Sequence, residues 1–177
     1  MSVAVWFTGL SGAGKTTVSR LVEERLKALG LPVVRLDGDE LRARPQWRLG
    51  FTRQDREEQT RRLGLMAARH VREGAICLVA AIAPFAAARN EVRRALGDMI
   101  EVWCRADLET LAAKDVKGLY ARALRGEIVE FTGVSSPYEP PENPEVTVFT
   151  YLESPEESAN RVAQAIAERL GVPGNDR

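Results

Sequence analysis

The sequence predicts an α/β protein in which a parallel sheet of about five strands carries helices on both faces. Two observations lead to this fold class. Short apolar runs of strand length alternate with longer stretches whose apolar residues recur at helical spacing, and turns rich in glycine, aspartate or proline follow several of the runs. Strands that alternate with helices are joined by crossover connections, which keep the strands parallel and place the helices over the sheet.

Five apolar segments are the predicted strands. They are residues 3–7, 31–36, 75–83, 99–104 and 146–152. The segment 75–83 is apolar throughout, so we expect a central strand that is covered on both faces.

Three longer segments are the predicted helices. They are residues 16–29, an arginine-rich region 40–62 that continues as a helix toward residue 73, and residues 155–170. In the first of them Val18, Val22 and Leu26 fall on one face, which we expect to pack on the sheet. We expect the tail at residues 171–175 to be frayed.

A glycine-rich turn directly follows the first predicted strand. Residues 9–16 read Gly-Leu-Ser-Gly-Ala-Gly-Lys-Thr, a complete G-x-x-x-x-G-K-T phosphate-binding loop, or P-loop. Such a loop wraps its backbone N–H groups around nucleotide phosphates, Lys15 reaches the outer phosphates, and the Thr16 hydroxyl is suited to hold Mg²⁺. The sheet is therefore predicted to be of the P-loop NTPase type. The residues assigned to the nucleotide site are Gly9, Ser11, Gly12, Ala13, Gly14, Lys15, Thr16 and Thr17.

Two carboxylates follow the second predicted strand. Asp37 and Asp39 lie two residues apart, and in an extended segment such side chains point the same way, so both could face the nucleotide. There they could organise Mg²⁺ and accept the proton of an attacking hydroxyl. The alternative is plain turn chemistry. No aspartate ends the segment 75–83, where many P-loop ATPases carry a second magnesium ligand, so that role falls to Asp37 and Asp39.

Arginines follow the second carboxylate. The planar guanidiniums of Arg42 and Arg56 are suited to paired hydrogen bonds with phosphate or sulfate oxygens, and we expect both to face a ligand. The alternative is a solvated helix face on which Asp55, Glu57 and Glu58 balance the arginines.

A long polar segment occupies residues 115–144. It is rich in glycine and proline, and a loop of this length in a compact domain usually has a function, so we predict a lid over the site. A merely mobile surface loop is the alternative. The P-loop, the two aspartates and the turn at Ala83 and Pro84 all follow predicted strands, so they should gather at one edge of the sheet.

Composition narrows the remaining possibilities. The 177 residues predict one domain, and a formal net charge of zero argues against a nucleic-acid partner. No apolar run approaches membrane-spanning length, so we expect a cytoplasmic protein with no membrane partner. Cys77 and Cys104 lie in apolar strands and are predicted to be buried, inert thiols, and His70 is predicted to be structural.

Taken together, these segments resemble the adenylylsulfate kinase family, whose members phosphorylate the 3′-hydroxyl of adenosine 5′-phosphosulfate. The resemblance covers almost the whole chain. It is carried by residues 9–17, 36–39, Arg42, 49–52, 55–56, 61–62, 82–84, 115–120, 131–133 and 137–139.

The resemblance implies an enzyme that uses ATP and Mg²⁺ and acts as a homodimer. It implies catalytic roles for Lys15, Asp39 and Asp37, and Mg²⁺ at Thr16 with Asp39 as a second ligand. Phe51 and Phe131 would stack on the substrate adenine. The implied substrate-binding residues are Asp39, Arg42, Phe51, Arg56, Gln59, Ile82, Ala83, Lys117, Gly118, Leu119 and Phe131.

The chain departs from the family pattern at several positions, among them Ser135, which lies near a position that is often acidic. Gln59 stands where the family has asparagine, which would shift or remove a hydrogen bond to the substrate, and Lys114 replaces an arginine. Ala83 stands where many members have a serine that is phosphorylated, so only direct transfer from ATP is open here. Two alternatives follow: a related P-loop kinase that acts on another nucleoside or sugar hydroxyl, or a module that binds ATP without catalysis.

Overall fold

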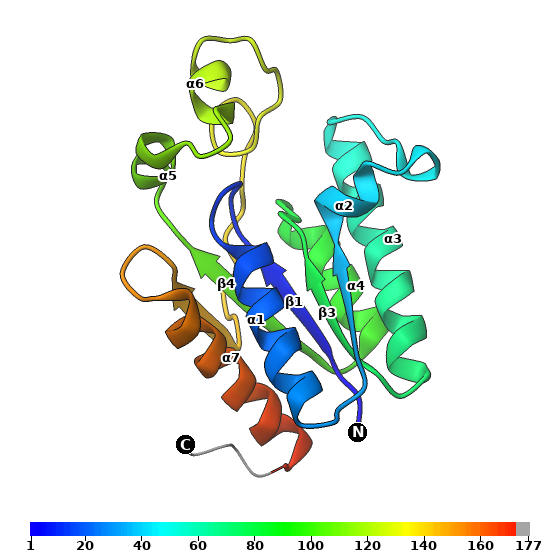
Figure 1. The fold of residues 1–177 in the computed structure, drawn as a ribbon. Helices are drawn as coiled ribbons and strands as arrows, with labels where there is room; N and C mark the ends of the chain where they lie inside the picture. The colour runs from blue at the N-terminus through cyan, green and yellow to red at the C-terminus, as the bar shows by residue number, and fades with distance from the viewer. Residues whose placement is uncertain (173–177) are drawn as a thin grey trace.

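The computed structural model describes residues 1–172, and its centre is a five-stranded parallel sheet with helices on both faces (Figure 1). The strand order is β2-β3-β1-β4-β5, and every neighbouring pair is parallel. The strands are β1 (Ala4–Thr8), β2 (Val33–Asp37), β3 (Ile76–Ala80), β4 (Met99–Arg105) and β5 (Val146–Phe149). The predicted fold class is confirmed.

The helices are α1 (Lys15–Ala28), α2 (Gly38–Arg42), α3 (Arg53–Arg72), α4 (Ala86–Leu96), α5 (Leu108–Lys114), α6 (Leu119–Leu124) and α7 (Pro155–Leu170). A short 3₁₀ turn covers Pro45–Trp47. Capping boxes begin α3 at Thr52 and α7 at Ser154, where the hydroxyl and an acidic side chain three residues later each accept a backbone N–H.

Strand alternation divides the core into two layers. Val5 and Phe7 of β1 belong to the cluster that includes buried residues of α1 and α7, whereas Ala4 and Trp6 belong to the cluster with α3 and α4. Figure 1 shows α1 and α7 on one side of the sheet and α3 and α4 on the other. Because both faces of the inner strands are covered, β1 and β3 are buried along their whole length.

The carboxyl ends of the strands face a group of short elements. In Figure 1, α2 lies beyond the end of β2, and α5 and α6 lie beyond the end of β4. The P-loop connects β1 to α1 at the same edge. This is the edge where parallel α/β sheets bind ligands.

Several predicted boundaries are corrected. The central strand ends at Ala80, and residues 81–85 form a loop. The helix predicted for the arginine-rich region is not continuous, since α3 begins only at Arg53. The last strand is shorter than predicted, because β5 ends at Phe149 and a turn follows. The predicted lid segment is not all loop, because it contains α6. Residues 173–177, which include most of the tail predicted to fray, lie outside the described residues.

Within residues 1–172, none of the helices combines the length and the apolar character needed to span a membrane.

Candidate active site

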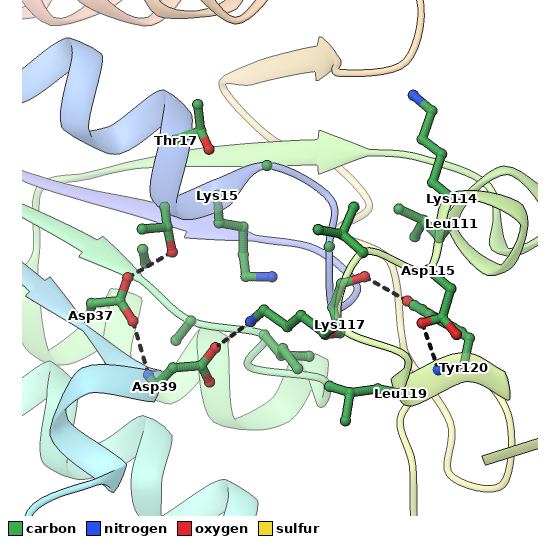
Figure 2. A pocket seen from close by; sticks show the side chains of 18 residues that line it. Lys15, Thr17, Asp37, Asp39, Leu111, Lys114, Asp115, Lys117, Leu119 and Tyr120 are labelled. Carbon is green, nitrogen blue, oxygen red and sulfur yellow. Dashed lines mark hydrogen bonds and ion pairs between the residues drawn. The ribbon is translucent and has the colours of Figure 1, made fainter. Parts of the chain in front are cut away.

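The P-loop lines a cavity of about 290 Å³ at the carboxyl edge of the sheet, which we call the P-loop pocket (Figure 2). Its walls come from the P-loop, the end of β2, the loop after β3 and the segment from α5 to α6. The lining residues are Ser11, Gly12, Gly14, Lys15, Thr16, Thr17, Asp37, Asp39, Ala80, Ala81, Ile82, Leu111, Lys114, Asp115, Val116, Lys117, Leu119 and Tyr120.

Glycine is required at both ends of the P-loop. A Cβ atom at Gly9 would lie 2.5 Å from the carbonyl oxygen of Cys104, which no side chain could tolerate. Gly14 precedes α1 with φ of 85°, a left-handed conformation that glycine adopts without steric penalty. The loop can therefore pass close to β4 and still turn into the helix, with free N–H groups at the first turn of α1.

Lys15 is held by its own loop. Its Nζ donates to the carbonyl oxygens of Gly9 and Leu10 at 2.9 and 2.8 Å. Burial lowers the pKa of Lys15 below its ordinary value, and the charges of Asp39 and Asp37 oppose that shift. The ammonium is thus a partly buried cation at the base of the pocket, where it is available to a phosphate group.

Asp37 is buried and fully engaged. One of its oxygens accepts from the Thr16 hydroxyl at 2.7 Å and from Arg35 at 3.3 Å. The other accepts the backbone N–H groups of Asp39 and Glu40, so Asp37 is the N-cap of α2. Asp37 therefore orients the Thr16 hydroxyl and starts a helix at the same time.

The predicted extended arrangement of the two aspartates is wrong, because α2 begins at Gly38 and Asp39 is already helical. Both side chains nevertheless line the P-loop pocket. The Asp39 carboxylate is 75% exposed and pairs with Lys117 at 3.4 Å. A pair this exposed contributes about 0–1 kcal/mol, so a ligand can separate the two charges at little cost.

A second, smaller cavity of about 90 Å³ adjoins the first, and we call it the arginine pocket. Asp39, Ala81 and Ile82 line both pockets, so the Asp39 carboxylate stands at the boundary between them. The full lining is Gly38, Asp39, Arg42, Phe51, Arg56, Gln59, Thr60, Leu63, Ala81, Ile82, Ala83 and Pro84.

Two guanidiniums and an aromatic ring dominate the arginine pocket. Arg42 and Arg56 lie over the ring of Phe51, at 4.8 and 5.6 Å from its centre. Burial lowers the pKa of both arginines below the ordinary value, and the charge of Arg42 adds to the lowering at Arg56. Two partly desolvated cations this close together favour an anionic ligand between them.

Gln59 supports Arg42. Its amide oxygen accepts from Arg42 Nη2, and its amide nitrogen donates to the carbonyl oxygen of Gly38 at 3.2 Å. Arg42 also donates to the carbonyl oxygens of Leu49 and Gly50 at 2.9 and 2.8 Å. The glutamine that departs from the family pattern therefore holds a predicted ligand residue in place.

Ala83 has φ of 44°, a left-handed conformation that costs an alanine about 1–2 kcal/mol. It is buried in the loop after β3. Its carbonyl oxygen accepts from Arg89 at 2.6 Å. The wall of the arginine pocket is thus a strained turn that its surroundings hold in shape.

Four predicted site residues line neither pocket. Gly9 contributes only its carbonyl to Lys15, and Ala13 is buried in the core. Gly118 starts α6 with φ of 65°. Phe131 packs edge-to-face on Tyr120, with ring centres 5.0 Å apart. The P-loop motif predicted Gly9 and Ala13, and the family resemblance predicted Gly118 and Phe131.

Arg56 connects the two segments that carry the aromatic residues predicted to hold the adenine. Its guanidinium donates to the carbonyl oxygen of Phe51 at 2.9 Å and to that of Glu130. Glu130 directly precedes Phe131 in the chain. The two rings therefore belong to segments that one arginine holds together.

Sequence reasoning assigned no role to Tyr120 and Asp115. The Tyr120 hydroxyl donates to the carbonyl oxygen of Ser11 at 2.6 Å, which joins the lid segment to the P-loop (Figure 2). Asp115 accepts the N–H groups of Tyr120 and Ala121 at 3.0 and 2.9 Å. Both residues lie in a motif that carries the family resemblance, so the motif itself was the available signal.

The donor set fits Mg²⁺. This hard cation prefers oxygen ligands and usually takes one or two from the protein and the rest from phosphates and water. The P-loop pocket offers such oxygen ligands, because it is lined by Thr16, Asp37 and Asp39.

Comparisons with known proteins agree with this geometry. Residues 1–149 match the family model described as Adenylylsulphate kinase. The chain belongs to the adenylylsulphate kinase family. An adenylyl-sulfate kinase of Synechococcus sp. (strain JA-2-3B'a(2-13)) is 52% identical over 94% of this chain and 95% of the relative. One of Halothermothrix orenii is 49% identical over 94% of this chain and 90% of the relative.

Solved structures extend the agreement to three dimensions. The APS kinase of Mycobacterium tuberculosis in complex with AMPPNP and APS has a TM-score of 0.88 at 41% identity, over 93% of this chain and 97% of the other. A gluconokinase from Sinorhizobium meliloti has a TM-score of 0.64 at 20% identity, over 96% and 95% of the two chains, and shares the fold alone. The adenylylsulphate kinase family is thus supported by sequence and by fold.

Proposed function

We propose that this member of the adenylylsulphate kinase family transfers the γ-phosphoryl group of ATP to the 3′-hydroxyl of adenosine 5′-phosphosulfate. The products are ADP and 3′-phosphoadenylyl sulfate. The observation that carries the proposal is the position of Asp39, whose side chain lines both the P-loop pocket and the arginine pocket. A phosphate donor in one pocket and an alcohol in the other would meet beside this carboxylate.

The P-loop pocket is the donor side. The N–H groups of the loop and the Lys15 ammonium bind the β- and γ-phosphates and stabilise the charge that develops during transfer. The Thr16 hydroxyl, oriented by Asp37, and the Asp39 carboxylate would hold Mg²⁺. When bound, that ion neutralises phosphate charge.

The arginine pocket is the acceptor side. Arg42 and Arg56, joined by Lys117 from the lid segment, supply the positive charge for the phosphosulfate group. The ring of Phe51 offers a face for the adenine. Ile82 and Ala83 form the wall, and Leu119 closes the P-loop pocket from the side of the lid.

Transfer proceeds in one displacement. The 3′-oxygen forms a bond to the γ-phosphorus, the bond from that phosphorus to the β–γ bridging oxygen breaks, and the hydroxyl proton passes to the Asp39 carboxylate. Lys117 pairs with Asp39 across 3.4 Å, so arrival of the anionic acceptor would draw Lys117 away and leave the carboxylate ready to accept the proton. With alanine at position 83, direct transfer is the route proposed.

The test is coupled ADP release from purified protein with MgATP, with and without adenosine 5′-phosphosulfate. The proposal requires that ADP release depends on this acceptor and that it is preferred over adenosine 5′-monophosphate, gluconate and shikimate. The Lys15→Ala variant should lose about 100-fold or more in kcat/KM, whereas Lys27→Ala, which removes an exposed lysine paired with Glu23, should match the wild type. Equal rates without acceptor, or preference for a sugar, would reject the proposal.

We propose further that residues 1–177 act as one catalytic domain, with residues 115–144 as its lid. Following the family resemblance, the enzyme would work as a homodimer in the cytoplasm. Light scattering coupled to size-exclusion chromatography tests the assembly, and a mass near twice 19.5 kDa is expected.

A further inference from the structure

Arg89 of α4 is a buried cation that the proposed reaction does not use. The residue is 2% exposed, and its Nε donates to Glu101 at 3.0 Å, whose carboxylate is also buried. An ion pair with Glu101 is enough to balance the charge. The other two nitrogens are directed elsewhere, and their partners indicate what Arg89 does.

Both remaining nitrogens donate to backbone carbonyl oxygens of loops. Nη1 donates to Ala83 at 2.6 Å, and Nη2 donates to Glu139 at 2.7 Å. Ala83 belongs to the wall of the arginine pocket, and Glu139 lies near the end of the lid segment. One planar fork therefore joins β4, the pocket wall and the lid segment.

Glu139 makes two further hydrogen bonds between the lid segment and the chain that follows Ala83. Its N–H donates to the carbonyl oxygen of Pro84 at 2.8 Å, and its carboxylate accepts the N–H of Ala86 at 2.7 Å. β3 has ended at Ala80, so the sheet cannot hold these backbone groups. The hydrogen bonds to Arg89 and Glu139 take the place of the strand-to-strand hydrogen bonds that these backbone groups lack.

Thr8, at the end of β1, adds hydrogen bonds to the lid segment and to the loop after β3. Thr8 donates to the carbonyl oxygen of Ile82 at 2.6 Å, and its hydroxyl lies 3.0 Å from that of Tyr138. Ala83, in the middle of these contacts, has the strained φ of 44°. A conformation of this kind persists only where its neighbours determine it.

We propose that Arg89 is a positioning residue for the acceptor: it holds the Ile82–Ala83 wall of the arginine pocket and couples that wall to the lid segment. It touches no substrate. The identity of the acceptor rests on the proposed function, but the coupling does not. Arg89 contacts Glu101, Ala83 and Glu139 and makes no hydrogen bond to the P-loop in the described structure, so its loss should weaken acceptor binding and spare ATP binding.

The test compares Arg89→Lys with Arg93→Lys. Lysine keeps the charge beside Glu101, but a single ammonium cannot reproduce the flat three-way fork. Arg93 is the matched control, since it also lies on α4 and bonds Glu101, at 3.3 Å, while its other contacts are Met99 and Glu145. In Arg89→Lys the KM for adenosine 5′-phosphosulfate should rise about tenfold with the KM for MgATP within about twofold, and in Arg93→Lys both should stay within about twofold.

Hydrogen exchange gives a readout that does not depend on activity. The amides of Ala86 and Glu139 should exchange faster in Arg89→Lys than in the wild type. In Arg93→Lys their exchange rates should equal those of the wild type. Faster exchange in a protein that ignores adenosine 5′-phosphosulfate would reject the proposed function and support the coupling. The coupling would be overturned if the amides of Ala86 and Glu139 exchanged at the wild-type rate in Arg89→Lys. It would also be overturned if the KM for MgATP rose together with the KM for adenosine 5′-phosphosulfate in both Arg89→Lys and Arg93→Lys.

A second variant covers the case in which Arg89→Lys fails to fold. Glu139→Ala removes the acceptor of the Ala86 N–H and leaves the buried pair of Arg89 and Glu101 intact. It should raise the KM for adenosine 5′-phosphosulfate about threefold, again without a change in the KM for MgATP. An unchanged KM for the acceptor in this variant would count against the coupling.

Discussion

The hydroxyl of Tyr120 donates to the carbonyl oxygen of Ser11 across 2.6 Å, so α6 of the lid segment is bonded directly to the P-loop. Tyr120 is 3% exposed, and its ring also packs on Phe131. Burial raises the pKa of the Tyr120 hydroxyl to about 12, so it remains a donor throughout the physiological range. The lid segment and the phosphate site are therefore joined through one hydrogen bond.

The first prediction concerns this bond. Tyr120→Phe removes the hydroxyl and retains the ring, so the packing on Phe131 should survive. Since a hydrogen bond of this kind contributes about 1 kcal/mol, kcat/KM for MgATP should fall about fivefold. Steady-state kinetics measure the effect, and the thermal unfolding midpoint shows whether the fold is intact. Wild-type kinetics in a folded variant would show that the bond does not contribute to function.

The second prediction separates the two aspartates, whose environments differ sharply. Asp37 is 4% exposed and bonded to Thr16 and to the first turn of α2, whereas the Asp39 carboxylate is exposed. Asp37→Asn should therefore lower the free energy of unfolding by about 1–3 kcal/mol and raise the Mg²⁺ concentration needed for activity. Its effect on folding follows from the lost negative charge beside Arg35 and from the new amide NH2 group, which cannot accept the hydrogen bonds of Thr16 and Arg35.

Asp39→Asn should behave in the opposite way. Stability should stay within about 0.5 kcal/mol of the wild type, because among residues 1–172 the carboxylate makes only an exposed ion pair, while kcat should fall about 100-fold to 10,000-fold. Denaturant unfolding and turnover measured on the same preparations distinguish the two residues. The matched control is Asp98→Asn, which removes a surface pair with Arg169. If Asp39→Asn retained wild-type turnover, the proton acceptor would have to be another group.

The start of α2 shows where sequence reasoning could have gone further. Asp37 followed three residues later by Glu40 is an N-cap signature, and it was available beside the reading of an extended turn. With a helix beginning at Gly38, Asp39 still lines the P-loop pocket, although the predicted extended geometry is wrong. The catalytic role of Asp39 stays a prediction. Local patterns predicted the strands and the P-loop because those depend on neighbouring residues.

Contacts between distant segments were beyond such reasoning. Tyr120 and Ser11 are 109 residues apart, and Arg56 and Glu130 are 74 apart. The helix α4 was not predicted, for a related reason. Its buried face contains Arg89 together with small side chains such as Ala88, so it lacks a clear row of large apolar residues. A buried arginine reads as a surface residue until its partners on other elements are known.

The third prediction concerns the two thiols. The sequence predicted buried cysteines, and the structure confirms this for Cys77 and Cys104. Burial raises the pKa of each thiol to about 12, and for Cys104 the charge of Lys15 opposes the shift. Because the thiolate is the reactive form, both should react with a thiol-specific reagent at pH 8 about 100-fold more slowly in the native protein than in urea. Rapid modification of either thiol without unfolding would contradict this burial.

The last prediction is a pH dependence within the lid segment. Asp115 accepts backbone N–H groups of α6, and the bond from Ala121, followed by that from Tyr120, holds the pKa of its carboxyl below the ordinary value. A carboxyl whose pKa is lower in the folded state stabilises that state above the unfolded pKa of about 3.9 and loses this effect as the pH falls through the folded value. Protonation should therefore loosen the start of α6.

Hydrogen-exchange protection factors measure this directly. In the wild type the amides of Tyr120 and Ala121 should lose protection only as the pH falls below about 4, through the lowered pKa of Asp115, while the amides of β3 keep theirs. Asp115→Asn keeps one of the two acceptor oxygens, so one of these two amides should be weakly protected already at neutral pH, and both should respond little to acid. Loss of protection in α6 and β3 together would indicate global acid unfolding, and Asp115 would then have no separate effect on the lid segment.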